Sequence, residues 1–551
     1  MEVVLEITVP LLMADLIDYG VTNADGTYII KKGLQMALCA VLALILGVGS
    51  AKFSALAGQG LGANIRKAEY EKLQSYSFSN IDHFSVSSLV TRLTSDVTNI
   101  QNAVSTGMRP FGRSPVMLIF ATSFAFRINS TLALVFLVAL PTLAVLLILI
   151  IINVGPLYGR MQSAIDQVNR CIQENLTAIR VVKSYVRGDY EVEKFGVVNE
   201  NLKSESEKAF GTAVLNMPAM QFVMYGTILG ILLIGGRLIN EGQMMIGQLT
   251  SFLSYVLLIL NSLMMMSNVF LLMTRSLASA ERIMEVIDEK IDITDENAKD
   301  IAVVKGEIEF DHVWFKYKDT AKEYVLSDVS FHIKPGQTVG IIGQTGSSKT
   351  TLVQLIPRLY DVTKGEVKID GINVKEYPVR HLRDAVAMVL QKNTLFSGSL
   401  IDNLRWGNEN ATLDEIKEAC QIACVDEFVD RLADGYDTEM GQEGVNVSGG
   451  QKQRICIARA ILKKPKVLIL DDSTSAVDTA TEAKIRSGLA EKLPDMTKII
   501  IAQRISSVRH ADQIIIMDRG HVEAIGTHES LLRDNQIYQE IYASQKEGAD
   551  L

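Results

Sequence analysis

The stretch KVLILDDSTSAVD, residues 466–478, places two adjacent acids directly after a run of four apolar residues. A short apolar run that ends in a polar turn predicts a buried β-strand over 467–470. Such a strand delivers the carboxylates of Asp471 and Asp472 to one edge of a sheet. The stretch therefore predicts an α/β domain whose functional site lies beside these two acids.

A second stretch, TVGIIGQTGSSKTTLVQLI at 338–356, predicts a strand, a glycine-containing loop and the start of a helix. A phosphate-binding loop needs close backbone approach, inward N–H groups, a lysine, and a hydroxyl for magnesium. Gly343, Gly346, Lys349 and Thr350 occupy those places, whereas Ser348 stands where the pattern has glycine. The residues expected to bind the nucleotide in this loop are Gly343, Gln344, Thr345, Gly346, Ser347, Ser348, Lys349, Thr350 and Thr351.

The first half of the chain contains long apolar segments. Residues 128–159, 209–236 and 242–274 carry no charge, and each run exceeds the ~20 residues that cross a hydrocarbon core as a helix. Two shorter runs, at 33–51 and 114–126, indicate further spans. We interpret 3–18 as the outer half of a sixth span whose start lies outside this sequence.

The segment 3–18 carries Glu6, Asp15 and Asp18. Ionisable residues inside a membrane segment are functional candidates. The alternative, which we favour at this point, is that they lie near the outer water boundary. A cleaved signal peptide is not expected, because no basic leader or small-residue cleavage site accompanies the apolar run.

The distribution of lysine and arginine predicts the orientation in the membrane. The long polar segments after the second and fourth spans are rich in both residues, and the opposite loops are short and poorer in them. An excess of positive charge marks cytoplasmic segments, so everything after Arg275 is predicted to be cytoplasmic. The two long segments favour helices that continue beyond the bilayer, with 174–195 as a candidate contact for the soluble domain.

The composition limits other functions. A net charge of −9 gives no general electrostatic footprint for nucleic acid. The five cysteines are scattered and odd in number, so a disulfide framework is not expected. Cys420 and Cys424 lack a second Cys/His pair, which favours packing over zinc binding.

A third motif, VSGGQKQR at 447–454, lies between the phosphate loop and the acid-bearing strand. With the three motifs in this order, residues 306–545 resemble the nucleotide-binding domain of an ATP-binding cassette exporter, of the multidrug and lipid type. The six spans resemble its transmembrane half. The resemblance covers nearly the whole chain, and it implies ATP and Mg²⁺ as cofactors and a multi-pass protein of a bacterial plasma (cytoplasmic) membrane.

We therefore expect a multidomain membrane protein with two folded parts. An all-α six-helix transmembrane domain with long cytoplasmic extensions covers 1–285, and a linker covers 286–305. An α/β nucleotide-binding domain of the phosphate-loop type covers 306–545, followed by a tail at 546–551.

The resemblance assigns roles to the matching residues. It implies that Tyr317 stacks on adenine and that Lys349 holds the β- and γ-phosphates. The implied metal-binding residues are Thr350, Gln391 and Asp471. The implied catalytic residues are Asp472, Gln503, Gln391, Asp478 and the signature Ser448, Gly449, Gly450 and Gln451, which grips the γ-phosphate bound to the opposite cassette. Taken singly, Tyr317 could pack in the core, Gln391 could lie on the surface and Asp478 could cap a helix.

Three positions depart from the family pattern. Asp472 stands where the catalytic base is normally glutamate, so its carboxylate is withdrawn by about 1.5 Å, one carbon–carbon bond. Gln503 stands at the switch histidine; glutamine can hydrogen-bond a phosphate but cannot take a positive charge. Ser348 is the third departure. Because the signature is intact, the pattern implies a site that binds MgATP but hydrolyses it poorly, in a chain that completes the active site of a second, non-identical half-transporter.

The implied function is export of hydrophobic or amphipathic compounds (drugs, lipids or peptides) out of the cytoplasm or inner leaflet, with no nucleic-acid partner. The alternative is an ATP-gated channel or sensor that uses slow hydrolysis, which uphill transport in vesicles would distinguish. The spans exclude a soluble cassette ATPase. An importer is disfavoured, because most importers keep membrane and ATPase domains on separate chains.

Overall fold

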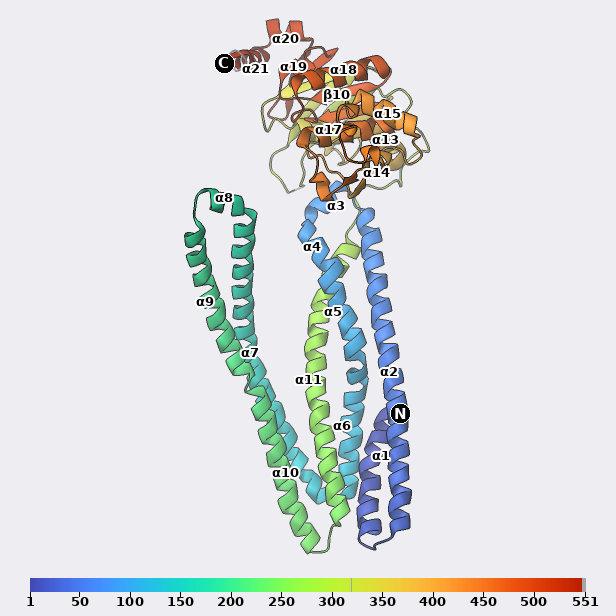
Figure 1. Ribbon diagram of the computed structural model, residues 1–551, viewed down its shortest axis with the longest axis vertical. Helices are drawn as coiled ribbons and strands as arrows, with labels where there is room; N and C mark the ends of the chain where they lie inside the picture. Colours follow the sequence, from blue (N-terminus) through green and yellow to red (C-terminus); the bar gives the residue numbers. More distant parts are fainter. Residues whose placement is uncertain (319, 548–551) are drawn as a thin grey trace. The chain divides into compact units, whose positions relative to one another are not determined.

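The computed structural model describes residues 1–318 and 320–547. The chain divides into two compact units, and Figure 1 follows their elements along the sequence. The first unit comprises Met1–Glu71 and Val90–Ile287, and the second comprises Lys72–Leu89 and the chain from Asp288 onward. Lys72–Leu89 therefore packs with the second unit, although the sequence places it between two spans. Of the expected tail at 546–551, residues 548–551 lie outside the described residues.

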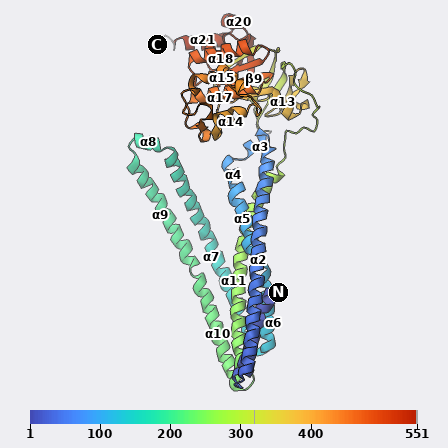
Figure 2. The ribbon, with the colours of Figure 1, turned by 45° about the vertical axis from the view of Figure 1, so that its right-hand side comes forward.

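The first unit is built from helices, several of them very long (Figures 1 and 2). Its main helices are α1 (Glu2–Asp15), α2 (Gly26–Gln74), α5 (Val97–Asn102), α6 (Met108–Ile128), α7 (Ser130–Thr177), α8 (Ile179–Ser184), α9 (Gly188–Ala213), α10 (Asn216–Asn240) and α11 (Ile246–Asp288). Both views show α7 and α9 side by side, with α8 at the turn between them. Helix α7, with 48 residues, is longer than the ~20 residues that cross a hydrocarbon core.

Four segments of the described chain are long and apolar enough to cross a membrane, by length and composition: Gly26–Gln74, Ser130–Thr177, Gly188–Asn240 and Ile246–Asp288. They contain the predicted spans 33–51 and 209–236 and most of 128–159 and 242–274. Residues 128–129 precede the start of α7, and the first residues of 242–274 lie in the turn before α11. The other two predicted spans correspond to α1, which is short, and α6, which arginines interrupt.

Buried hydroxyl groups join α11 to α1. Tyr255 and Ser251 are fully buried, and the Tyr255 hydroxyl donates to the Ile7 carbonyl at 2.7 Å. The Ser251 hydroxyl donates to the Pro10 carbonyl. Because a buried hydroxyl without a partner costs about 1–3 kcal/mol, these bonds fix which faces of the two helices meet.

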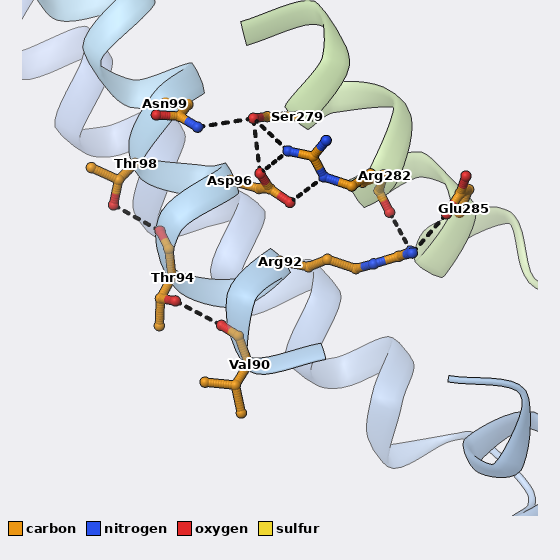
Figure 3. A network of polar contacts seen from close by, with 9 residues as sticks. All are labelled: Val90, Arg92, Thr94, Asp96, Thr98, Asn99, Ser279, Arg282 and Glu285. Carbon is orange, nitrogen blue, oxygen red and sulfur yellow. Dashed lines mark hydrogen bonds and ion pairs between the residues drawn. The ribbon is translucent and has the colours of Figure 1, made fainter. Parts of the chain in front are cut away.

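A polar network joins the segment after α4 (Val86–Thr91) to the end of α11 (Figure 3). Asp96 is 2% exposed at its side chain and accepts hydrogen bonds from Ser279 Oγ at 2.9 Å and from Arg282 Nε at 2.8 Å. Four residues away, Arg92 donates to the Arg282 carbonyl at 2.6 Å and to Glu285 at 2.7 Å. These contacts hold two segments together that lie some 190 residues apart in the chain.

The second unit contains a six-stranded and a four-stranded sheet, besides the short antiparallel pair of β7 (Gly398–Ser399) and β8 (Glu439–Met440). The larger has the strand order β12-β11-β3-β10-β9-β6, in which only the β11–β12 pair is antiparallel. Its strands are β3 (Thr338–Gly343), β6 (Val386–Val389), β9 (Val467–Asp471), β10 (Thr497–Ile501), β11 (Gln513–Asp518) and β12 (His521–Gly526). The smaller sheet is antiparallel, with the order β2-β1-β4-β5. Its strands are β1 (Ile308–Phe315), β2 (Leu326–Ile333), β4 (Lys364–Ile369) and β5 (Ile372–Asn373).

The apolar runs seen in the sequence form the centre of the larger sheet. Every residue of β9 and β10 is buried, as expected for parallel strands covered on both faces. Helix α17 (Gly449–Leu462) packs against this sheet and against α15 (Leu413–Ile422). The predicted fold class, a helical membrane domain plus an α/β nucleotide-binding domain, is confirmed.

Candidate functional site

The candidate site lies where neighbouring parallel strands of the larger sheet end. In the order β3-β10-β9-β6, the strands end at Gly343, Ile501, Asp471 and Val389. Carboxyl ends of parallel strands meet at one edge, which is where ligands bind in open α/β sheets. The fold thereby gathers the phosphate loop, the two acids, Gln503 and Gln391 at one edge of the sheet.

The phosphate loop turns tightly from β3 into α12 (Lys349–Gln354). A Cβ at Gly343 would lie 2.2 Å from the Met517 carbonyl oxygen, so no side chain fits there. Ser348 has φ 69° and ψ 23°, which is the left-handed region that favours glycine. The substitution noticed in the sequence therefore falls on a strained backbone position.

Lys349 folds back over this loop. Its ammonium donates to the carbonyls of Gly343 at 2.8 Å and Gln344 at 2.9 Å, and to Ser347 Oγ at 3.1 Å. Burial lowers the pKa of Lys349, and the charge of Asp471 acts in the opposite direction. The ammonium is thus held at the mouth of the loop, where phosphate oxygens can replace the carbonyls as its partners.

Asp471 and Thr350 form the part of the site that suits a magnesium ion. Thr350 Oγ1 donates to Asp471 Oδ1 at 3.0 Å, while the buried Oδ2 of Asp471 has no hydrogen-bond partner. Burial raises the pKa of Asp471, and the bond from Thr350 opposes this shift. An unpartnered buried carboxylate oxygen beside a hydroxyl fits a hard cation with oxygen ligands. The described residues contain no separate cluster of three or more His, Cys, Asp or Glu that could hold a metal.

Asp472 is already engaged by a neighbouring side chain. Gln503 Nε2 donates to Asp472 Oδ2 at 2.7 Å, and the Asp472 backbone has φ 48°. Burial raises the pKa of Asp472, whereas hydrogen bonds from the amides of Gln503 and Gln391 lower it. The sequence predicted these three residues singly, and the structure brings them into one cluster.

The signature residues Ser448 and Gln451 hydrogen-bond to each other at the start of α17. Ser448 Oγ accepts from the Gln451 N–H at 3.3 Å, and Gln451 Oε1 accepts from the Ser448 N–H at 2.8 Å. A Cβ at Gly450 would lie 2.7 Å from the Ala476 carbonyl oxygen, but one at Gly449 would meet nothing closer than 3.6 Å. Among the described residues, no hydrogen bond joins Ser448 to the phosphate loop of the same chain.

Asp478 caps helix α18 (Thr479–Lys492) by accepting from the Thr481 N–H at 3.0 Å. These hydrogen bonds at the helix start lower the pKa of the Asp478 carboxyl. Capping thus accounts for Asp478 within this chain, as the simpler explanation from the sequence had it.

Tyr317 lies over the helix that follows the phosphate loop. Its hydroxyl is 2.8 Å from Thr351 Oγ1, and its ring packs edge-on against Tyr360 with centroids 5.2 Å apart. Tyr360 in turn donates to Asp82 Oδ2 at 2.7 Å and packs on Phe78, both in α3 (Phe78–His83). Burial raises the pKa of Tyr317. Sequence analysis missed Tyr360 and Asp82, which belong to no motif and meet across 278 positions.

Comparisons with known proteins agree with this architecture. The family profile of the ABC transporter transmembrane region matches residues 1–263, and that of the ABC transporter matches residues 326–475. The chain is 39% identical to the ABC transporter ATP-binding protein YfiB of Bacillus subtilis, over 100% of this chain and 96% of that protein. It is 33% identical to the ATP-dependent lipid A-core flippase of Pseudomonas putida, over 93% of this chain and 86% of that protein.

A further sequence relative and a solved structure are also similar to this chain. The putative multidrug export ATP-binding/permease protein YgaD of Bacillus subtilis is 32% identical over 88% of this chain and 83% of its own length. In three dimensions, a bacterial Atm1-family ABC exporter solved with ATP bound has the same fold. It has a TM-score of 0.84 and 24% identity, and covers 99% of this chain and 97% of its own.

Proposed function

Because the chain belongs to the ABC transporter family, with a transmembrane region and an ATPase domain on one polypeptide, we propose that it is the poorly hydrolysing subunit of a heterodimeric exporter. The chain is a multi-pass protein of the plasma membrane whose nucleotide-binding unit is cytoplasmic. Family membership links the chain to ATP hydrolysis coupled to transport. In that cycle this chain binds MgATP and completes the partner's hydrolytic site, but hydrolyses ATP poorly at its own site.

The residues of the phosphate loop fit MgATP. Lys349 would hold the β- and γ-phosphates, and Thr350 with Asp471 would hold the magnesium ion, with Gln391 beside it. The buried oxygen of Asp471 that lacks a partner is the observation that supports this assignment. When bound, Mg²⁺ would neutralise charge on the phosphates. We further assign Tyr317 to the adenine ring, because its side chain lies over the start of α12.

The observation that carries the proposal is the contact between Gln503 and Asp472. A catalytic base must reach the attacking water and accept its proton. The Gln503 amide donates to Asp472 Oδ2 at 2.7 Å and so stabilises the charged form of the carboxylate. An amide cannot take the proton itself or become positively charged. Together with the shorter aspartate side chain, this contact supports slow hydrolysis at this chain's own site.

The strained backbone at Ser348 also supports slow hydrolysis at this chain's own site. In the left-handed region a residue with a Cβ costs roughly 1–2 kcal/mol more than glycine. The strain lies in the loop that would have to fit closely around the phosphates. The catalytic base, the switch residue and the phosphate loop thus all differ from the family pattern. Lys349, Thr350 and Asp471 keep the groups needed to bind MgATP.

The signature supports a role in a partner's site. Ser448 and Gln451 form a regular helix start, and Gly449 is free of close contacts within its own chain. Nothing in the described part of this chain therefore explains why Gly449 should lack a side chain. A γ-phosphate bound to a second cassette explains it, and Asp478 in the next loop would lie between the two cassettes. Two copies of this chain would pair two poor sites, so the proposed partner is a non-identical half-transporter.

The proposed cargo is a hydrophobic or amphipathic compound taken from the cytoplasm or inner leaflet. The printed names of two relatives support this class, one a lipid A-core flippase and the other a putative multidrug exporter. Both are similar to this chain over more than four fifths of it.

Two measurements test the proposal. Tagged at its C-terminus and purified from native membranes, the chain should bring with it a second, different cassette subunit in equal amount. Purified alone, it should bind MgATP with little turnover, and Lys349→Ala should remove the binding. Robust hydrolysis by a homogeneous preparation of this chain, abolished by Lys349→Ala, would refute the proposal.

A further inference from the structure

Four charged side chains meet inside the apolar part of the first unit. Glu2 and Glu6 lie on α1, and Arg109 and Arg113 lie at the start of α6. Arg109 donates to Glu2 Oε1 at 2.6 Å, Arg113 pairs with Glu6, and Arg113 also lies 3.8 Å from Glu2 Oε1. None of the four side chains is more than one third exposed. We call them the charged quartet.

The quartet lies far from the outer end of the helices. A Cβ at Gly47 of α2 would be 3.0 Å from Arg109 Nη2 and 3.1 Å from Glu2 Oε1. Gly47 therefore lies at the same depth in the membrane as the quartet. The predicted span on α2 begins at Gly33, and the helix from Gly33 to Gly47 rises about 21 Å of the ~30 Å thickness of a hydrocarbon core. The quartet therefore lies in the inner half of the bilayer.

This position distinguishes Glu6 from the other two acids of the segment 3–18. Asp15 pairs with Lys32 at 2.6 Å and Asp18 accepts from the Gly247 N–H at 2.6 Å, both beside turns between helices. For these two acids the explanation by an outer boundary is kept. Glu6 lies two and a half turns further along α1, pairs with an arginine, and needs another reason.

A cavity of about 840 Å³ opens beside the quartet. All four charged residues line it, and the rest of the wall is largely apolar, with Leu44 and Val48 from α2 and Leu257 from α11. The buried Nε of Arg109 has no hydrogen-bond partner, so this guanidinium retains an unused donor. The site thus combines balanced charges, a free donor and an apolar wall in one space.

We propose that this cavity binds the head group of a zwitterionic amphiphile, a molecule with an anionic phosphate or carboxylate, an amine and a hydrocarbon chain. Arg109 takes the anion and Glu2, released from Arg109, takes the amine. The hydrocarbon chain lies along the apolar wall. This names the cargo class within the proposed export function, and it rests on that function only for the later transport of the ligand.

Charge balance favours a zwitterion over a simple anion. The quartet is neutral, with two acids and two arginines. An anion that displaced Glu2 from Arg109 would leave a carboxylate without its closest partner in a poorly solvated site, which is costly. A ligand with both charges exchanges partners in pairs and leaves neither charge unpaired. We therefore expect a preference of roughly tenfold or more, the effect of about 1.4 kcal/mol.

Binding is tested on the full chain in a neutral detergent, with any subunit that co-purifies and without nucleotide. The probes are lysophosphatidylethanolamine, lysophosphatidylglycerol of equal chain length, and glycerophosphoethanolamine, which has the zwitterionic head but no chain. Displacement of radiolabelled lysophosphatidylethanolamine gives the three affinities. We expect the zwitterionic amphiphile to bind about tenfold tighter than the anionic one, and the chainless head group to bind more weakly than either.

Glu2→Gln removes the carboxylate that takes the amine and should abolish the preference, while Arg127→Gln, at the other end of α6 and outside the cavity, should retain it. Equal affinity for the zwitterionic and anionic amphiphiles on the unmodified chain would overturn the proposal without any variant. So would a chainless head group that binds as tightly as the amphiphile. Because no nucleotide is present, these outcomes are independent of the asymmetry between ATP sites, which the ATPase and co-purification measurements test separately.

Discussion

The double change Asp472→Glu with Gln503→His should speed hydrolysis at this chain's own site. A hydrogen bond to a charged group contributes about 1.5–3 kcal/mol, and one to a neutral group about 0.5–1.5 kcal/mol. The Gln503–Asp472 bond therefore loses about 1–1.5 kcal/mol when the carboxylate accepts a proton. At 1.36 kcal/mol per tenfold, this slows the proton transfer by about 5- to 13-fold.

The added methylene of glutamate supplies a second gain. It extends the carboxylate by about 1.5 Å, and a misplacement of ~1 Å at a reacting centre can cost about 100-fold. The two effects together set a ceiling near 1,000-fold. The left-handed backbone at position 472, with φ 48°, suits aspartate better than glutamate, and Ser348 stays unchanged. We therefore expect a gain of at least about tenfold, below that ceiling.

The assay must separate the two ATP sites of the complex. Photo-crosslinking of trapped azido-nucleotide, followed by peptide mapping, assigns nucleotide to this chain or to its partner. The matched control is Asp472→Asn with Gln503→His, which lacks a carboxylate and should show no gain. If the repaired chain traps and releases nucleotide at the unmodified rate, these two side chains do not limit hydrolysis.

Two further predictions concern stability. Ser348→Gly should raise the thermal transition of the nucleotide-binding unit by up to about 2–4 °C. The relief of roughly 1–2 kcal/mol of backbone strain exceeds the ~0.4–1 kcal/mol by which a glycine stabilises the unfolded chain through its conformational entropy. Calorimetry checks this, and an equal gain in Ser348→Ala, which keeps the Cβ, would contradict it. Asp96→Asn should destabilise the network in Figure 3 by about 1–3 kcal/mol. Arg282 loses its ion pair with a buried carboxylate, but water can still solvate its guanidinium, which is about half exposed, and this limits the cost. Glu285→Gln should cost less than Asp96→Asn, because the Glu285 side chain is 60% exposed and its buried partner Arg92 keeps the bond to the Arg282 carbonyl. Hydrogen exchange in α5 and the end of α11 reports the difference, and equal effects would contradict the assigned role of Asp96.

Elements with a strong local pattern could be predicted from the sequence. The run 467–470 became a fully buried strand because a parallel strand covered on both faces must be apolar along its whole length. The uncharged runs became membrane-length helices for a similar reason. The departures at Ser348, Asp472 and Gln503 were also visible, since each stands in a motif that expects another residue type.

Contacts between distant segments could not be predicted in this way. The Gln503–Asp472 bond forms because β10 and β9 are neighbours, and strand order is not written in either segment. Arg109 and Glu2 meet across 107 positions, beside Gly47 of a third helix. Acids in the first span could be noticed, but their partners could not be named without the packing of α1 against α6.

The measurement that tests the central claim most directly compares two variants of this chain in the same partner complex. Gly449→Val places a side chain in the signature without a close contact in its own chain, whereas Gly450 is unsuitable because its Cβ would lie 2.7 Å from the Ala476 carbonyl oxygen. If the signature serves the partner's competent site, Gly449→Val should reduce steady-state ATP hydrolysis by about 100- to 1,000-fold, the typical effect of losing a donor to the developing charge. Asp472→Asn alters a base that is already poorly placed and should reduce hydrolysis only modestly. Loss of hydrolysis in Asp472→Asn together with normal turnover in Gly449→Val would contradict the account.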